Sequence, residues 1–418
     1  QAIWVVYFAS QSAGSQLVLG MSLEAVLCNT SLVNSYLEAC RAAARKSNWL
    51  IEQSLRETTN AGGDTFTIEA HGDHPRTFSS RLHAEDVVVL ARSLDLVLPC
   101  LVYLDVAHNL LRDAGAEELS RGLLGPHARQ LRHLSVRGND ISSVGIAAVC
   151  AAAPLSPALS SIDVSQNPLE KTGGLMVISL VTSCDMRSIR LADTLADMDV
   201  VVGFASALLS SSSKLEVCDL ENPRILTLQE EHTIHMGQML RTNTFLSELH
   251  VGKHRIRSDG MRQLAHFLME NKTLRILDLR CNEIGSDGAV FLGDLLRQDC
   301  QLTHLDLSGN RIGEKDNLEG VTAIADALTS NRMLVHLDLN HNSLCGGALQ
   351  ILGRFVDQNS TLESLALFHN QWDQTSANKF HQILGDRARI LPLSADFLTS
   401  EVDLRIDVCW MRDFQPKS

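Results

Sequence analysis

The chain has 418 residues, 45% of them hydrophobic, and a formal net charge of −13. It is longer than a usual single globular domain, and its hydrophobic content is sufficient for a large core. The negative charge argues against non-specific nucleic-acid binding, which needs many basic contacts to phosphates. It favours solubility and basic partner surfaces.

The N-terminal region predicts a short apolar segment followed by a helical cap. Residues 2–9, AIWVVYFA, are too few to span a bilayer. They lack a basic leader and the chain does not begin with Met, so we expect the natural chain to begin further upstream. No later run is suitable for a transmembrane helix. Residues 31–58 predict one or two helices that cover the open edge of a first strand, and we assign 1–62 to this segment.

One phrase, LxxLxLxxNxL, recurs along the chain at intervals of 27 to 32 residues. Apolar residues at its first, fourth and sixth positions alternate as in a strand. A helical segment follows, as in 288–299 of the unit that starts at Leu274. The ten starts are Leu101, Leu131, Leu159, Met186, Leu215, Leu246, Leu274, Leu302, Leu334 and Leu362.

A repeat of this length predicts a solenoid in which each unit contacts mainly its neighbours. Residues 65–94 add a degenerate first unit with extra residues in its bend. We therefore expect an α/β solenoid of about 11 units over 63–390, shaped like a horseshoe. Parallel strands should line its concave face, and the wider helices should form its convex face.

An asparagine column follows the strands. We expect these side chains to be buried and to satisfy backbone groups in the bend that leaves each strand. Thr194, Pro223 and His254 replace the asparagine in three consecutive units, so we expect distortion near 186–235. The column consists of Asn109, Asn139, Asn167, Asn282, Asn310, Asn342 and Asn370.

The C-terminal region predicts an end to the solenoid. Residues 377–390 should form the last outer helix, and 391–418 a cap or tail. The alternating segment 401–410, EVDLRIDVCW, could add a final strand that closes the sheet. Alternatively, it could pair with the sheet edge of a partner; we favour the cap.

The repeat resembles the ribonuclease-inhibitor type of leucine-rich repeat, over roughly three quarters of the chain and with ten units in one register. Residues 35–55, SYLEACRAAARKSNWLIEQSL, the long first bend and a C-terminal Asp-Phe are similar to a narrower family within this type. That family is associated with ciliated and germ-line cells, so the resemblance implies an axonemal or assembly role. It implies no catalytic residue.

No catalytic or metal-binding motif emerges from the sequence. Nucleotide-binding, nucleophile-elbow and HExxH patterns are absent, and no two of the ten cysteines form CxxC, which favours a reducing compartment. We interpret His232 and His235 as a solvated helix face rather than a metal site. His71 and His74 are interpreted as part of a polar bend. We therefore predict a non-enzyme with no cofactor, no metal and no small-molecule substrate.

Strand positions that are not used for the core should face solvent and bind a partner. The fifth position carries mostly aspartate. These aspartates either form an acidic stripe that binds a basic partner or are simply the common residue at this position of the repeat type. Near the C-terminus, histidines and a phenylalanine gather, and aromatic patches are typical of binding hot spots. The candidate residues are His304, His336, His341, Phe368, His369, Asp278, Asp306 and Asp338.

We therefore predict a protein–protein interaction scaffold within a large multi-protein assembly, with no nucleic-acid or membrane partner. The resemblance implies the axoneme of a cilium or flagellum in a cytoplasmic setting, with the nucleus as an alternative location. The other hypothesis is a soluble intracellular regulator or inhibitor that clamps a protein in the concave face.

Overall fold

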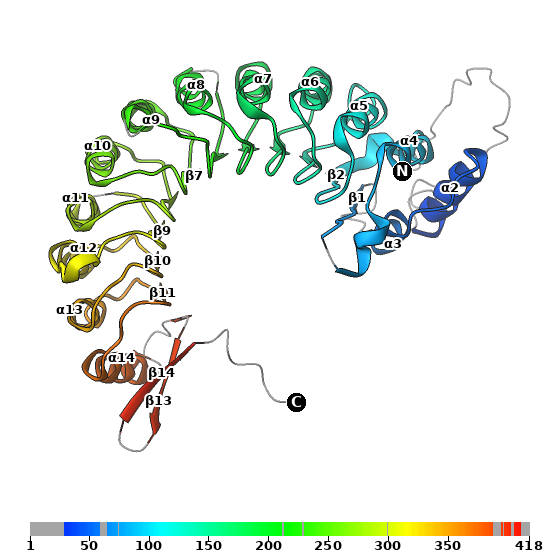
Figure 1. Cartoon of the computed structure of the whole chain (residues 1–418). Helices are drawn as coiled ribbons and strands as arrows, with labels where there is room; N and C mark the ends of the chain where they lie inside the picture. Colours follow the sequence, from blue (N-terminus) through cyan, green and yellow to red (C-terminus); the bar gives the residue numbers. More distant parts are fainter. Residues whose placement is uncertain are drawn as a thin grey trace, which may run out of the picture. The chain divides into compact units, whose positions relative to one another are not determined.

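The computed structural model describes residues 29–58, 65–73, 75–210, 213–227, 230–298 and 300–387, and the backbone of 394–395, 397–402 and 405–410. The chain divides into two compact units at Asn167/Pro168. Figure 1 shows the same layering within each of them, with strands forming one layer and helices the other.

The first unit carries four parallel strands in chain order, β1 to β4. Each strand is followed by a helix, which explains the parallel pairing because the chain must cross over between strands. Its described elements are α2 Asn29–Ala42, α3 Trp49–Glu57, β1 Phe66–Glu69, η1 Pro75–Ser80, α4 Ala84–Leu94, η2 Leu98–Cys100, β2 Leu101–Asp105, α5 Arg112–Gly122, β3 His133–Ser135, α6 Ser143–Ala152, η3 Ala153–Leu155 and β4 Ser161–Asp163.

The second unit continues the pattern through eight parallel strands, β5 to β12. Its described elements are α7 Glu170–Ser183, β5 Ser188–Arg190, α8 Met198–Leu208, β6 Val217–Asp219, α9 Glu231–Thr242, β7 Glu248–His250, α10 Ser258–Leu268, β8 Ile276–Asp278, α11 Ser286–Arg297, β9 His304–Asp306, η4 Glu314–Asp316, α12 Glu319–Ser330, β10 His336–Asp338, α13 Gly346–Val356, β11 Ser364–Ala366, α14 Gln374–Arg387, β12 Ser394–Ala395, β13 Phe397–Val402 and β14 Arg405–Trp410.

The core lies between the strand and helix layers, as the alternation predicts. Leu249, Leu277, Leu305 and Leu337 pair with one another across β7 to β10, and each is buried. Apolar side chains of the helices, such as Leu292 of α11, complete the layer. The α/β leucine-rich repeat solenoid expected from the sequence is therefore confirmed.

The described helices α2 and α3 precede the first strand, and α3 contacts it. The Glu69 backbone N–H of β1 donates a hydrogen bond to Ser54 Oγ at 2.8 Å, and the Thr58 hydroxyl donates to the Thr67 carbonyl at 2.9 Å. Side chains at the end of α3 thus satisfy backbone groups along the free edge of β1, which blunts its tendency to pair with another chain.

The asparagine column has the structural role that its position predicts. Asn282 Nδ2 donates to the Leu279 carbonyl of its own unit at 2.8 Å and to the Val251 carbonyl of the preceding unit at 3.0 Å. Its Oδ1 accepts from the Ile256 backbone N–H at 3.0 Å. One buried amide thus joins two successive repeats.

The distortion expected near 186–235 does not affect strand pairing in the described residues, so that prediction is wrong there. The β5–β6–β7 register is continuous. The Thr194 hydroxyl donates to the Leu191 carbonyl at 2.9 Å, which reproduces the hydrogen bond that Asn282 makes to the Leu279 carbonyl of its own unit. His254 replaces the bond between units, because its Nε2 lies 2.8 Å from the Leu220 carbonyl. Within the expected range, the described residues 220–227 between β6 and α9 form neither helix nor strand.

The end of the chain differs from the expected cap. The strand that extends the sheet is β12, which pairs with β11. The alternating segment 401–410 lies in an antiparallel hairpin, with Phe397 opposite Trp410, and the hairpin lies against α14. Two runs joined by a short connection pair locally, because closing such a loop costs little entropy.

Candidate functional site

The strand face of the second unit, which we define as the solvent side of β5 to β11 and the turns that follow these strands, carries the residues predicted to bind a partner. The structure arranges the five rings in two groups. His304 and His336 lie opposite each other on β9 and β10, with ring centroids 4.1 Å apart. His341, Phe368 and His369 follow β10 and β11.

The second group is a compact aromatic cluster. The His341 and His369 rings stack at 4.5 Å, and the Phe368 ring meets His369 edge-on at 3.9 Å. Both histidines are exposed and Phe368 is half-buried. Burial and the charge of His369 lower the pKa of His341. The three rings therefore form one continuous aromatic surface.

Backbone geometry holds this cluster in place. His341 and His369 have left-handed backbones with φ of 53° and 56°, at the turn position where Gly309 has φ of 69°. A left-handed conformation costs a non-glycine residue about 1–2 kcal/mol. His341 and His369 therefore lower the stability of the fold relative to glycine, the residue that occupies this turn position, as Gly309, in the repeat before that of His341.

The aspartate column has a clear structural role. Oδ1 of Asp278, Asp306 and Asp338 accepts a hydrogen bond from the backbone N–H two residues later, at 2.9, 2.8 and 2.8 Å. Such a bond mimics a backbone turn and ends the strand. Asp278 is buried, and the other two are half-buried. Of the two interpretations, the geometry supports repeat architecture, and a role in binding a basic partner stays a prediction.

A charge network links side chains of β5 to β8 and of the turns that follow these strands. His250 lies 2.7 Å from Glu248 and 3.1 Å from Asp278. Burial alone would lower the pKa of His250, but hydrogen bonds to these two carboxylates and the charge of Asp219 raise it to about 9. The network continues from Asp278 to Arg280, whose Nε lies 3.3 Å from the carboxylate.

The other charged side chains of this network also form ion pairs with one another. Arg280 and Lys253 both pair with Glu221, the latter at 3.0 Å, and Arg190 lies 3.6 Å from Glu248. Arg280 therefore supplies a cation beside the aspartates, as its position suggests. This part of the strand face satisfies its own charges, which leaves the histidine and phenylalanine groups as the surface more available to a partner.

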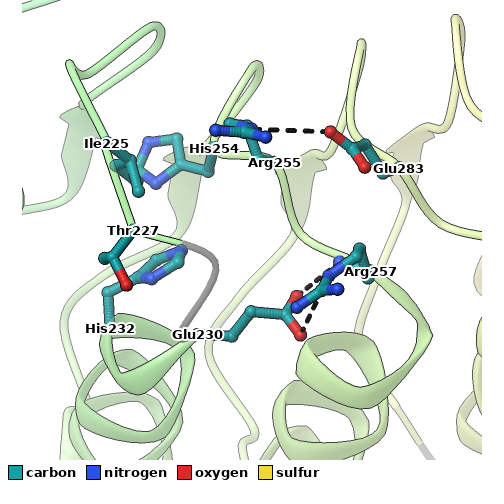
Figure 2. Close-up of a pocket in the computed structure, with 8 residues that line it drawn as sticks. All are labelled: Ile225, Thr227, Glu230, His232, His254, Arg255, Arg257 and Glu283. Carbon is teal, nitrogen blue, oxygen red and sulfur yellow. Dashed lines mark hydrogen bonds and ion pairs between the residues drawn. The ribbon is translucent and has the colours of Figure 1, made fainter.

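The expected solvated helix face at His232 is wrong. His235 is exposed, but His232 is buried in the first turn of α9 and faces His254, with centroids 5.6 Å apart. Figure 2 shows both rings in a pocket with Ile225 and Thr227. The spacing of one helix could not reveal this contact, because His254 comes from the bend after β7 in the next repeat.

In the first unit, His71 occupies the polar bend expected for it. Its Nε2 lies 3.1 Å from Asp105 Oδ2, and this hydrogen bond raises the pKa of His71. His74 lies outside the described residues.

No described helix is long and apolar enough to cross a membrane. No group of three or more His, Cys, Asp or Glu in the described residues is arranged to hold a metal ion.

Comparison with known proteins identifies the repeat. A family model described as "Leucine Rich repeat" matches residues 97–120, 127–150, 270–293 and 298–316. Leucine-rich repeat-containing protein 34 of mouse (Mus musculus) is 37% identical over 92 residues, which are 22% of each chain. The mouse ribonuclease inhibitor is 30% identical over 182 residues, which cover 43% of this chain and 39% of the inhibitor.

A solved structure of the leiomodin-1 actin-binding site 2 covers 46% of this chain and 91% of its own, with 17% identity and a TM-score of 0.29. The chain spans about a fifth of the mouse repeat-containing protein 34 and about two fifths of the mouse inhibitor that it matches.

Proposed function

We propose that this chain, which belongs to the leucine-rich repeat proteins of the ribonuclease-inhibitor type, is a non-enzymatic scaffold that binds a protein partner on its strand face. The observation that carries the proposal is the ring cluster of His341, Phe368 and His369. Buried aromatic groups at the centre of an interface contribute much of its binding energy.

The contrast along the strand face supports this choice of surface. Around His250, carboxylates and cations are already paired within the chain. A partner that docked there would have to replace these ion pairs, whereas the ring cluster can be covered without breaking any of them.

We further propose that the assembly is the axoneme of a cilium or flagellum. The support is the similarity to leucine-rich repeat-containing protein 34, whose family is associated with ciliated cells. The test is fractionation of native axonemes. Sedimentation of the protein with microtubules after detergent extraction is the expected result, and complete release with the cytosolic fraction contradicts the axonemal assignment.

An inhibitor that clamps an enzyme is a second candidate, favoured by the longer alignment with the mouse ribonuclease inhibitor. In that case a one-to-one complex with a free enzyme should form in solution, and the enzyme's activity should fall as the complex forms. A multi-protein scaffold instead predicts co-purification with several subunits at fixed ratios.

A further inference from the structure

Two buried imidazoles meet where the asparagine column is interrupted. His254, in the bend after β7, is 0% exposed, and His232, in the first turn of α9, is 1% exposed. Their ring centroids are 5.6 Å apart at an interplanar angle of 36°. Figure 2 shows both rings lining one pocket of the second unit, on elements that belong to successive repeats.

The hydrogen bond of His254 fixes its tautomer. Its Nε2 must donate to the Leu220 carbonyl, 2.8 Å away, because a carbonyl oxygen can only accept. In the neutral ring Nδ1 therefore carries a lone pair. That atom and both ring nitrogens of His232 are buried and have no hydrogen-bond partner among the described protein atoms. Three buried imidazole nitrogens thus lie on residues that line one small pocket, and no group of the described residues satisfies them.

The charged side chains of the pocket engage one another rather than the imidazoles. Arg255 lies 3.5 Å from Glu283, and Arg257 lies 3.8 Å from Glu230. Figure 2 shows the Glu230 carboxylate directed at Arg257. Burial lowers the pKa of His232 to about 4 and that of His254 to about 3. Both rings are therefore neutral at physiological pH, the state in which imidazole binds metal ions.

We propose that His232 and His254 together bind one divalent transition-metal ion of the Zn²⁺ class. A Zn–N distance of about 2.0–2.1 Å places two imidazoles that share a tetrahedral ion about 5–6 Å apart between centroids, which matches the observed separation. His254 would bind through Nδ1. Its Nε2–H already donates to a backbone carbonyl, the arrangement that orients metal-binding histidines.

The protein supplies two ligands, and water completes the coordination. The described residues contain no set of three or more His, Cys, Asp or Glu suited to a metal ion, so affinity should be lower than at a four-ligand structural zinc site. The ion would join α9 to the bend after β7. It would thus add a second connection between these two repeats, beside the hydrogen bond of His254 to the Leu220 carbonyl.

The experiment titrates Zn²⁺ into the chelator-treated full chain by calorimetry and records the visible absorption of bound Co²⁺. His254→Asn is the decisive variant, because it removes the imidazole but keeps a donor for the Leu220 carbonyl. Asn282 makes the equivalent bond one repeat later, where it donates to the Val251 carbonyl of the preceding unit. His232→Leu removes the other ligand. His235→Ala on the same helix is the matched control, and His341→Gly excludes binding by the exposed ring cluster.

We expect one ion per chain in the unmodified protein, with tetrahedral Co²⁺ absorption and a melting temperature that rises by about 2–4 °C at saturation. Both pocket variants should lose the ion, and both controls should keep it. No binding by the unmodified chain, or unchanged binding by a folded His254→Asn protein, overturns the proposal.

Discussion

His250 Nδ1 lies 3.1 Å from Asp278 Oδ2, which links β7 to β8 through a partly buried ion pair on the strand face. Hydrogen bonds to Asp278 and Glu248 outweigh the effect of burial and raise the pKa of His250 from 6.5 to about 9. A histidine with a raised folded pKa stabilises the fold fully below its unfolded pKa. It loses that contribution as the pH rises through the folded value.

The free energy of unfolding should therefore fall by at most about 3 kcal/mol between pH 6.5 and 9 because of His250. His250→Gln should flatten this part of the pH profile, since glutamine does not titrate. Urea unfolding at several pH values measures the effect. An equally steep decline in the variant would assign the pH dependence to other groups.

His254→Asn should stabilise the metal-free chain by about 1 kcal/mol. Asparagine can donate to the Leu220 carbonyl that His254 now contacts and to the Val251 carbonyl of its own unit, and it removes the buried, unsatisfied Nδ1. Thermal unfolding in the presence of a chelator provides the measurement. A clear loss of stability would show that the imidazole ring is required for packing at this position.

Leu277→Ala should cost about 2–5 kcal/mol. The side chain is 1% exposed and pairs with Leu249 and Leu305 on the neighbouring strands, so truncation leaves a cavity between the strand and helix layers. Chemical denaturation measures the change. A loss below about 1 kcal/mol would contradict the position of this leucine in the core.

Asp306→Asn separates the two interpretations of the aspartate column. Asparagine Oδ1 can still accept from the Ser308 N–H, so stability should stay within about 0.5 kcal/mol, whereas Asp306→Ala should lose about 1 kcal/mol. Binding of the partner by Asp306→Asn should be unchanged if the column is architectural. A salt-dependent loss of binding would instead support an acidic recognition stripe.

The repeat units could be derived from the sequence because the leucines and asparagines that define them act locally. The positions of Leu277 and Asn282 have equivalent neighbours in every regular unit, so the repeat predicts that both side chains are buried. The charge network around His250 and the pocket at His254 depend on contacts between side chains of successive repeats. Asp278 lies one repeat from His250 and pairs with it across β7 and β8, so the register places them together but does not predict the hydrogen bond between their side chains. His232 lies 22 residues from His254, a separation that is not that of the repeat.

The sequence pattern shows where the asparagine is missing, but it does not show which hydrogen bonds the replacing side chains make. Thr194 and His254 each reproduce one of the two bonds of an asparagine amide. The strand register of β5, β6 and β7 is therefore continuous, although these units lack the asparagine of the repeat motif.

The central claim is that the strand face binds a protein through its ring cluster and the neighbouring ring of His336. Its test needs a partner identified by crosslinking mass spectrometry on native material. His336→Ala, Phe368→Ala and His341→Gly are then combined in one chain, with glycine chosen because His341 has a positive φ. A matched chain carrying His235→Ala controls for loss of an exposed histidine elsewhere.

The decisive measurement is the dissociation constant of that partner for the two chains, alongside their melting temperatures. We predict binding at least about tenfold weaker for the triple variant, equivalent to about 1.4 kcal/mol, with a melting temperature no lower than that of the control. Unchanged affinity in a chain that melts normally would contradict the account.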